Sequence, residues 1–367
     1  MIRFIDFKRR YRLHGKEINK KIFSVFKRGW FVGGPERIGF EKKFADYSGA
    51  KFAVGVNSGT DSIAIALRSL GVGVGDEVIT VSHTATPTIA AIRMTGAIPV
   101  FVDVDEKTMV MNLDLVKNKI TKNTKVILPV HLYGYPVDMK KIVRIARKHN
   151  LFVVEDSCQA HGARYSNKMV GTMGDIGCFS FYPTKNLGAF GDAGMMITNN
   201  KKLFDRAREL RNFGEVDKYL NRIEGVNSGL DEIQAAVLNW GIDYLDRWNN
   251  TREDLALVYL RELGDLPITL PFVGHDETKR VWHLFVIRTK ERDRLRDFLK
   301  KNNIESAIHY PIPVFRQEAY RFLGYSDADL PVTSKLSQEI LSLPLYPELK
   351  ESEVLKICKV IKSFYKK

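Results

Sequence analysis

Short apolar runs rich in β-branched residues alternate with helical patterns between about residues 50 and 200, and this alternation limits the fold more than any other feature. Seven runs are predicted as strands: Phe52–Val56, Val78–Val81, Ile98–Val102, Val126–Val130, Phe152–Val154, Cys178–Phe181 and Gly194–Thr198. Helical patterns lie between several of them, at Asp61–Leu70, Pro87–Thr95 and Asp138–His149. Such alternation predicts an α/β fold with a large, mostly parallel sheet. Because ligands bind such sheets at the carboxyl ends of the strands, functional residues are expected directly after the runs.

The pattern changes after residue 230. A long helix is predicted to start after Asp231 and to reach Trp248 or even Leu263. It is followed by a strand at Leu284–Ile287 and by helices at Glu291–Asn302 and Ser352–Phe364. We therefore expect a large α/β domain with an N-terminal helical segment over residues 1–245. A smaller C-terminal α+β domain is expected over residues 246–367.

Charge and composition narrow the classes of function. The net charge of the 367 residues is +14, but residues 1–30 carry +8 of it and residues 350–367 carry +4. Basic residues are not interleaved with aromatic ones, so nucleic-acid binding is not expected as the main role. No apolar run approaches the roughly 18 residues of a membrane span. The three cysteines, an odd number, fit a reducing compartment, so a cytoplasmic protein is expected.

Two glycine-containing segments differ in their placement. Gly71–Asp76 follows a predicted helix and leads into a strand, which is the wrong order for a dinucleotide-binding loop. We interpret it as a helix stop and turn. Asn57–Asp61 instead follows a strand and opens a helix. Its glycine, hydroxyls and free N–H groups suit an anion cradle, but the same residues also suit a simple N-cap.

Polar groups cluster after the strand that begins at Phe152. Cys158 and His161 have a spacing seen in metal sites, but no second pair completes one, so no metal is expected. Asp156 can cap the next turn, or it can pair with a buried cation of a ligand. Neither reading is excluded by the residues alone.

A lysine follows the next predicted strand. Lys185 stands among hydroxyl-bearing and small residues, where a lowered pKa would suit Schiff-base chemistry. An anion cradle, a strand-end aspartate and such a lysine are the parts that a pyridoxal phosphate enzyme requires.

Five blocks of sequence extend this argument. These blocks are Asn57–Asp61, Val130–Gly134, Glu155–Gly162, Phe179–Gly188 and Asp231–Ala236. In them the chain resembles the DegT/DnrJ/EryC1/StrS family of sugar-nucleotide aminotransferases. Members of this family are fold-type I pyridoxal 5'-phosphate enzymes with a seven-stranded sheet. The resemblance implies that Lys185 and Asp156 are catalytic, Lys185 binding the cofactor covalently and Asp156 pairing with its pyridine nitrogen. It implies further cofactor contacts by Ser58, Gly59, Thr60, His83, Gln159, Ser180 and Asn227. In the family Asn227 would act from the neighbouring subunit, which implies a homodimer with shared active sites.

The substrate is also expected by resemblance. Trp282–Arg288 and His309–Pro313 are similar to the branch that aminates C3 of dTDP-linked 3-keto-6-deoxyhexoses, with L-glutamate as the amino donor. Substrate contacts are expected at Trp30, Phe31, Tyr182, His309 and Tyr310. Amination at C4 of a UDP-, GDP- or dTDP-linked 4-keto-sugar stays open. A sugar dehydratase is less favoured, because dehydratase relatives carry histidine where this chain has Lys185. The product would serve cell-surface glycan, such as lipopolysaccharide O-antigen, or natural-product biosynthesis.

Two positions depart from the family pattern. Relatives often place an aromatic ring over the cofactor where this chain has Ala85, and His83 is a candidate to replace it. Relatives often have arginine where this chain has Gly229, which removes one carboxylate contact.

Overall fold

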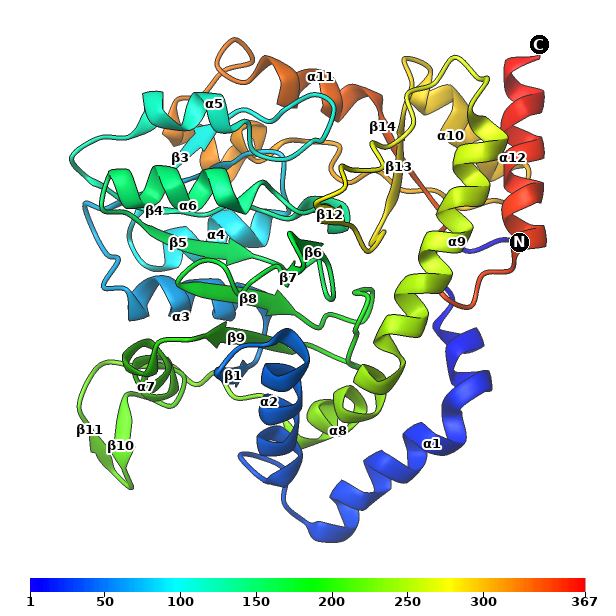
Figure 1. Cartoon of the computed structure of the whole chain (residues 1–367). Helices are drawn as coiled ribbons and strands as arrows, with labels where there is room; N and C mark the ends of the chain where they lie inside the picture. The colour runs from blue at the N-terminus through cyan, green and yellow to red at the C-terminus, as the bar shows by residue number, and fades with distance from the viewer. Residues whose placement is uncertain (367) are drawn as a thin grey trace.

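The computed structural model of the chain describes residues 1–366, and its centre is a seven-stranded sheet in the order β1-β9-β8-β5-β4-β2-β3 (Figure 1). The strands are β1 (Phe52–Val56), β2 (Glu77–Val81), β3 (Ile98–Val102), β4 (Thr124–Ile127), β5 (Phe152–Asp156), β8 (Ile176–Ser180) and β9 (Gly194–Thr198). Strand β9 is antiparallel to both neighbours, and the other pairs are parallel. The predicted α/β fold is confirmed, and each of the seven predicted runs overlaps a strand.

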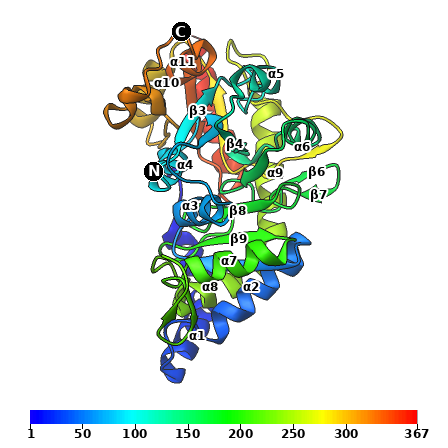
Figure 2. The ribbon, with the colours of Figure 1, turned by 90° about the vertical axis from the view of Figure 1, so that its left-hand side faces the viewer.

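Helices cover both faces of this sheet. Helices α3 (Gly59–Ser69) and α4 (Thr86–Met94) lie on one side, and α6 (Met139–Lys148) lies on the other (Figure 2). Further helices near the sheet edges are α2 (Pro35–Ser48), α5 (Leu113–Val116) and α7 (Lys201–Leu210). Helix α6 shows why the helices pack on the sheet. Its buried residues lie on one face of the helix, and its other residues are mainly Lys and Arg. The buried residues are Met139, Ile142, Ile145 and Ala146.

The turn between α3 and β2 contains the first glycine segment of the sequence analysis. Gly71 and Gly75 have φ angles of 75° and 89°, in the left-handed region that glycine adopts without strain. Because the turn joins a helix end to a strand start, the predicted helix stop is confirmed.

The helix predicted after Asp231 is divided in two. Helix α8 (Glu232–Gly241) and helix α9 (Leu245–Leu263) are joined by a 3₁₀ turn at Ile242–Tyr244. Asp231 holds the N-cap position, but its side chain makes no capping hydrogen bond.

The C-terminal elements pack beside the sheet around an apolar cluster of their own (Figure 1). They are β13 (Phe285–Arg288) paired antiparallel with β14 (Ile340–Leu343), and helices α10 (Arg292–Lys301) and α12 (Glu351–Tyr365). Helix α11 (Pro331–Glu339) instead buries Leu336 in the core cluster of the large sheet. Ile2 belongs to the C-terminal cluster, and its N–H donates to the carbonyl of Asn303 at 2.8 Å. Helix α1 (Phe7–Arg28) then runs from there to pack against α8. The domain division at residue 245 stays a prediction.

Short strands complete the fold. Strands β12 (Thr278–Lys279), β6 (Arg164–Tyr165) and β7 (Lys168–Met169) form a small sheet, and β10 (Glu215–Asp217) with β11 (Leu220–Asn221) forms a hairpin. That hairpin projects away from the sheet in Figure 1.

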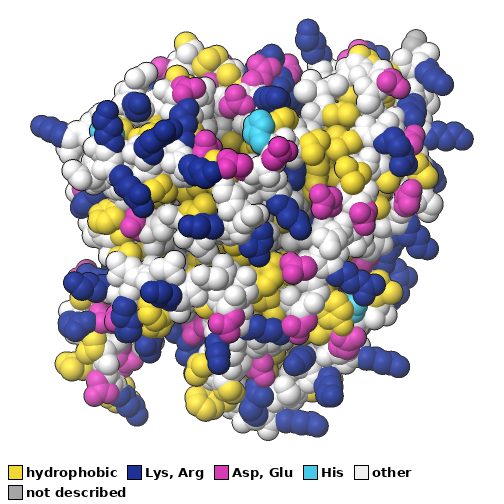
Figure 3. Space-filling model, in the orientation of Figure 1, with side chains coloured by type: hydrophobic (Ala, Val, Ile, Leu, Met, Phe, Trp, Pro, Cys, Tyr) yellow, Lys and Arg dark blue, Asp and Glu magenta, His cyan; other side chains and the backbone are white. Residues whose placement is uncertain are grey.

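On the face in Figure 3, Lys and Arg side chains are mixed with Asp and Glu over most of the surface. Among residues 1–366, no helix is both long and apolar enough to cross a membrane.

Candidate active site

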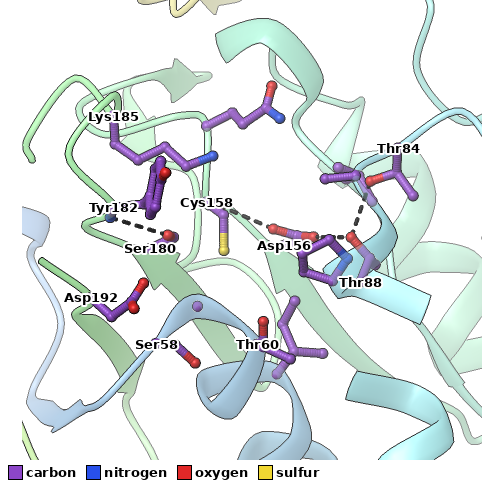
Figure 4. Close-up of a pocket in the computed structure, with 16 residues that line it drawn as sticks. Ser58, Thr60, Thr84, Thr88, Asp156, Cys158, Ser180, Tyr182, Lys185 and Asp192 are labelled. Carbon is purple, nitrogen blue, oxygen red and sulfur yellow. Dashed lines mark hydrogen bonds between the residues drawn. The ribbon is translucent and has the colours of Figure 1, made fainter. Parts of the chain in front are cut away.

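A cavity of about 370 Å³ opens where β5 and β8 end and where α3 and α4 begin (Figure 4). This is the edge of the sheet at which ligand binding was expected. Its lining residues are Ser58, Gly59, Thr60, Ile63, Thr84, Ala85, Pro87, Thr88, Val130, Asp156, Cys158, Gln159, Ser180, Tyr182, Lys185 and Asp192.

The start of α3 forms one wall. Ser58 is the N-cap residue, and its hydroxyl accepts a hydrogen bond from the Asp61 N–H at 3.1 Å. Within the described residues, no acceptor is found for the N–H groups of Gly59 and Thr60. A Cβ at Gly59 would lie 2.5 Å from Cβ of Ser180, so only glycine lets the helix start approach that hydroxyl so closely. Free N–H groups, hydroxyls and the helix dipole together make this wall suited to an anion.

Asp156 ends β5 and is 4% exposed. Its Oδ2 accepts from the Thr88 hydroxyl at 2.8 Å, and its Oδ1 accepts from the Cys158 N–H at 3.1 Å. No Lys, Arg or His among residues 1–366 forms an ion pair with it. A cationic group of a ligand is therefore the natural partner for this carboxylate, since buried charges are normally paired.

Lys185 extends into the cavity from the loop after β8 (Figure 4). Its backbone N–H donates to the carbonyl of Tyr182 at 2.8 Å, which fixes the loop. Burial lowers the pKa of the Lys185 amine, although Cys158 and Asp156 act in the opposite direction. A lowered pKa increases the fraction of neutral amine, which is the form that attacks a carbonyl group.

Comparison with known proteins shows the family of the chain. A family model described as the DegT/DnrJ/EryC1/StrS aminotransferase family matches residues 13–362. The chain belongs to this family.

Individual relatives agree with the assignment. The aminotransferase is 43% identical over 362 residues to a dTDP-3-amino-3,4,6-trideoxy-alpha-D-glucose transaminase of Streptomyces venezuelae, covering 98% of this chain and 95% of the relative. It is 43% identical over 364 residues to a dTDP-3-amino-3,6-dideoxy-alpha-D-galactopyranose transaminase of Aneurinibacillus thermoaerophilus, covering 99% of each. Among solved structures, it matches S. venezuelae DesV with a TM-score of 0.97 at 43% identity, covering 99% of this chain and 98% of that one.

Pyridoxal 5'-phosphate, the cofactor of this family, fits the donor set of the cavity. The anion wall at the start of α3 suits its phosphate, and the unpaired carboxylate of Asp156 suits a protonated ring nitrogen. The Lys185 amine has no hydrogen-bond or ion-pair partner in the described part of the chain, so it is free to bind an aldehyde. By contrast, residues 1–366 contain no group of three or more His, Cys, Asp or Glu placed to hold a metal ion.

Most of the predicted cofactor residues lie together. Eight of the predicted site residues line the one cavity, namely Ser58, Gly59, Thr60, Asp156, Gln159, Ser180, Tyr182 and Lys185. Tyr310 adjoins it, because its hydroxyl accepts from Nε2 of Gln159 at 3.2 Å, and burial raises the pKa of Tyr310 to about 12. His309 lies further back, where Nδ1 is 2.9 Å from Oγ of Ser342 and the ring stacks on Phe4. Burial lowers the pKa of His309 to about 4.

The other predicted residues lie elsewhere in this chain. Asn227 lines a separate cavity of about 470 Å³ next to Gly229, beside the β10–β11 hairpin. Trp30 and Phe31 follow α1 and are 55% and 46% exposed. His83 is buried 3.1 Å from the hydroxyl of Tyr133, and burial lowers its pKa to about 4. None of these four residues lines the cofactor cavity of its own chain.

Several lining residues were missed by sequence reasoning. Thr84 and Thr88 reach the cavity from the start of α4, and Thr88 contacts Asp156 directly. Cys158 and Asp192 line it as well. The spacing of four residues between the threonines at a helix start was the available signal, but only the fold brings them to Asp156. Ala85 lines the cavity without a ring, so Tyr182 is its only aromatic lining residue.

Proposed function

We propose that the chain transfers an amino group from L-glutamate to a nucleotide-linked keto-sugar, with a dTDP-linked 3-keto-6-deoxyhexose aminated at C3 as the preferred substrate. The observation that carries amino transfer is the placement of the Lys185 amine, the unpaired Asp156 carboxylate and the anion wall around one cavity.

Each residue then has a defined task. Bound pyridoxal 5'-phosphate supplies a reactive aldehyde and a ring that withdraws electrons from it. Lys185 would hold the cofactor through Nζ, and the same atom would take up and return protons during amino transfer. Asp156 keeps a proton on the ring nitrogen through its charge. Gly59, Thr60 and Ser180 hold the phosphate.

The sugar and the position of amination rest on the relatives. The relatives from S. venezuelae and A. thermoaerophilus are named for dTDP-3-amino sugars, and both match this chain over almost its full length. Amination at C4 and dehydration are the alternative outcomes of the experiment below. The participation of glutamate, the pathway to cell-surface or natural-product sugars and the cytoplasmic location stay predictions.

We also propose a homodimer with shared active sites. Asn227 lines a cavity other than the cofactor cavity of its own chain, so a contact with the cofactor phosphate would have to be made in a second copy. Trp30 and Phe31 are likewise exposed on one chain, which leaves them available to a neighbouring subunit.

The test is a panel of dTDP-, UDP- and GDP-linked 3-keto- and 4-keto-sugars incubated with the enzyme and ¹⁵N-labelled glutamate. The proposal expects one ¹⁵N-amino sugar, formed most rapidly from a dTDP-linked 3-keto-sugar, with the nitrogen placed at C3 by NMR. A product aminated at C4 would overturn the assigned position. A dehydrated product without nitrogen, or no product from any sugar, would overturn amino transfer.

A further inference from the structure

Two threonines connect the start of α4 to the carboxylate of Asp156. The Thr84 and Thr88 hydroxyl oxygens lie 3.0 Å apart, and the Thr88 hydroxyl lies 2.8 Å from Oδ2 of Asp156 (Figure 4). Thr84 and Thr88 are only 3% and 2% exposed. The three side chains therefore form a buried chain of hydrogen bonds that ends at the cavity.

The charge of Asp156 fixes the direction of this chain. An ionised carboxylate only accepts hydrogen bonds, so Thr88 must donate to it. With its single proton committed to Asp156, the Thr88 hydroxyl must accept from Thr84. Hydrogen bonds linked in this way polarise one another, so Thr84 strengthens the bond that Thr88 donates.

The contacts leave part of the carboxylate free. Thr88 binds one oxygen and the Cys158 N–H binds the other, and each carboxylate oxygen can accept a second hydrogen bond. A hydroxyl donor also carries no net charge. It can therefore hold a carboxylate in one orientation without replacing the cation that the carboxylate is to bind.

We propose that Thr88, supported by Thr84, is a positioning residue that orients the Asp156 carboxylate toward the ring nitrogen of the cofactor. The proposal rests on pyridoxal 5'-phosphate binding in this cavity. It predicts that the Thr88 hydroxyl raises the affinity for a ligand only when the ligand has a ring nitrogen with which Asp156 can pair.

The experiment measures the affinity of the apoenzyme for two ligands by fluorescence titration. One is pyridoxal 5'-phosphate, and the other is an analogue in which carbon replaces the ring nitrogen. Thr88→Val keeps the shape of the side chain but removes the hydroxyl. It should weaken binding of the natural cofactor by about 10- to 100-fold, as expected for losing a hydrogen bond to a charged group, and leave binding of the analogue almost unchanged.

Companion variants separate positioning from folding. Thr88→Ser retains the hydroxyl and should bind both ligands as the unsubstituted protein does. Thr84→Val should act in the same direction as Thr88→Val but less strongly. Thr80→Val is the matched control, because Thr80 is a buried β2 threonine whose hydroxyl donates to the Leu128 carbonyl at 2.9 Å. It should not discriminate between the two ligands.

The outcomes are distinguishable. If Thr88→Val weakens both ligands equally, or neither, the positioning role is wrong. If Thr88→Val does not fold, equal weakening of the two ligands by Thr84→Val overturns the role, and selective weakening of the natural cofactor supports it. If the unsubstituted protein binds neither ligand, the proposed function itself fails.

Discussion

The cofactor cavity and the surface around Asn227 are built in different ways. The cavity is made by the ends of β5 and β8 and the starts of α3 and α4, and Lys185 enters it from the loop that follows β8. The Asn227 surface is made by α7, the residues that follow it, the projecting β10–β11 hairpin and the segment from the end of α1 into α2. Lys185, Asp156 and the anion wall therefore lie together within one chain, whereas the residues expected to contact the cofactor phosphate in trans and part of the substrate lie outside this cavity.

Replacing Lys185 should have the largest effect on the cofactor side of this comparison. Lys185→Ala removes the only amine that lines the cavity, so kcat should fall by at least about 10³-fold, the scale of general acid–base catalysis. Steady-state assays of amino-sugar formation measure this loss. Lys168→Ala, at an exposed lysine in β7, is the control and should keep full activity.

Asp156→Asn should have the second-largest effect, which is a loss of affinity for the cofactor. The amide keeps the shape of the side chain but cannot balance a charge on the ring nitrogen. A hydrogen bond to a charged group contributes about 1.5–3 kcal/mol, which corresponds to a loss of about 10- to 100-fold in cofactor affinity. Titration of the apoenzyme with pyridoxal 5'-phosphate gives this value, and wild-type affinity together with wild-type turnover would show that another carboxylate has this role.

The Asn227 surface is tested by mixing two inactive variants. Asn227→Asp places a carboxylate near the cofactor phosphate, so repulsion should weaken cofactor binding. A mixture with Lys185→Ala contains heterodimers in which one site combines an intact Lys185 with an intact Asn227. Random equal mixing makes about half the dimers heterodimers, so about a quarter of the sites should recover.

This experiment has a conservative control. The Asn199 amide oxygen accepts from the Lys51 N–H at 2.9 Å, a bond that aspartate also accepts, so Asn199→Asp should stay active on its own. Subunit exchange is demonstrated first. If no activity is then recovered, Asn227 acts in the site of its own chain or in no site.

His309→Ala should have the smallest effect, since His309 lies behind Tyr310 and not on the cavity wall. We expect KM for the keto-sugar to rise severalfold while cofactor absorbance is unchanged. His149→Ala, at the exposed end of α6, serves as the control. A fall in the thermal midpoint with unchanged KM would instead show that His309 serves only the packing against Phe4 and Ser342.

The residues that sequence reasoning found are those with a local signature. Ser58 and Gly59 stand between a strand and a helix, and Asp156 and Lys185 follow apolar runs, so neighbouring residues already describe their setting. The seven strands were found for the same reason. The reversed direction of β9 was not predicted, because direction depends on pairing with β1 and β8 and not on local sequence.

The contacts that sequence reasoning missed join distant segments. Thr88 and Asp156 are 68 positions apart, and their hydrogen bond exists only because α4 packs beside the end of β5. The break between α8 and α9 was missed for a different reason, because the apolar pattern continues through the 3₁₀ turn.

The most direct test of the central claim is the absorbance of the purified protein reconstituted with pyridoxal 5'-phosphate, before and after glutamate and then a keto-sugar are added. The account predicts a yellow protein that glutamate bleaches and the keto-sugar restores, with neither change in Lys185→Ala. A yellow protein whose spectrum glutamate does not alter, or a Lys185→Ala variant that cycles like the unsubstituted protein, would contradict it.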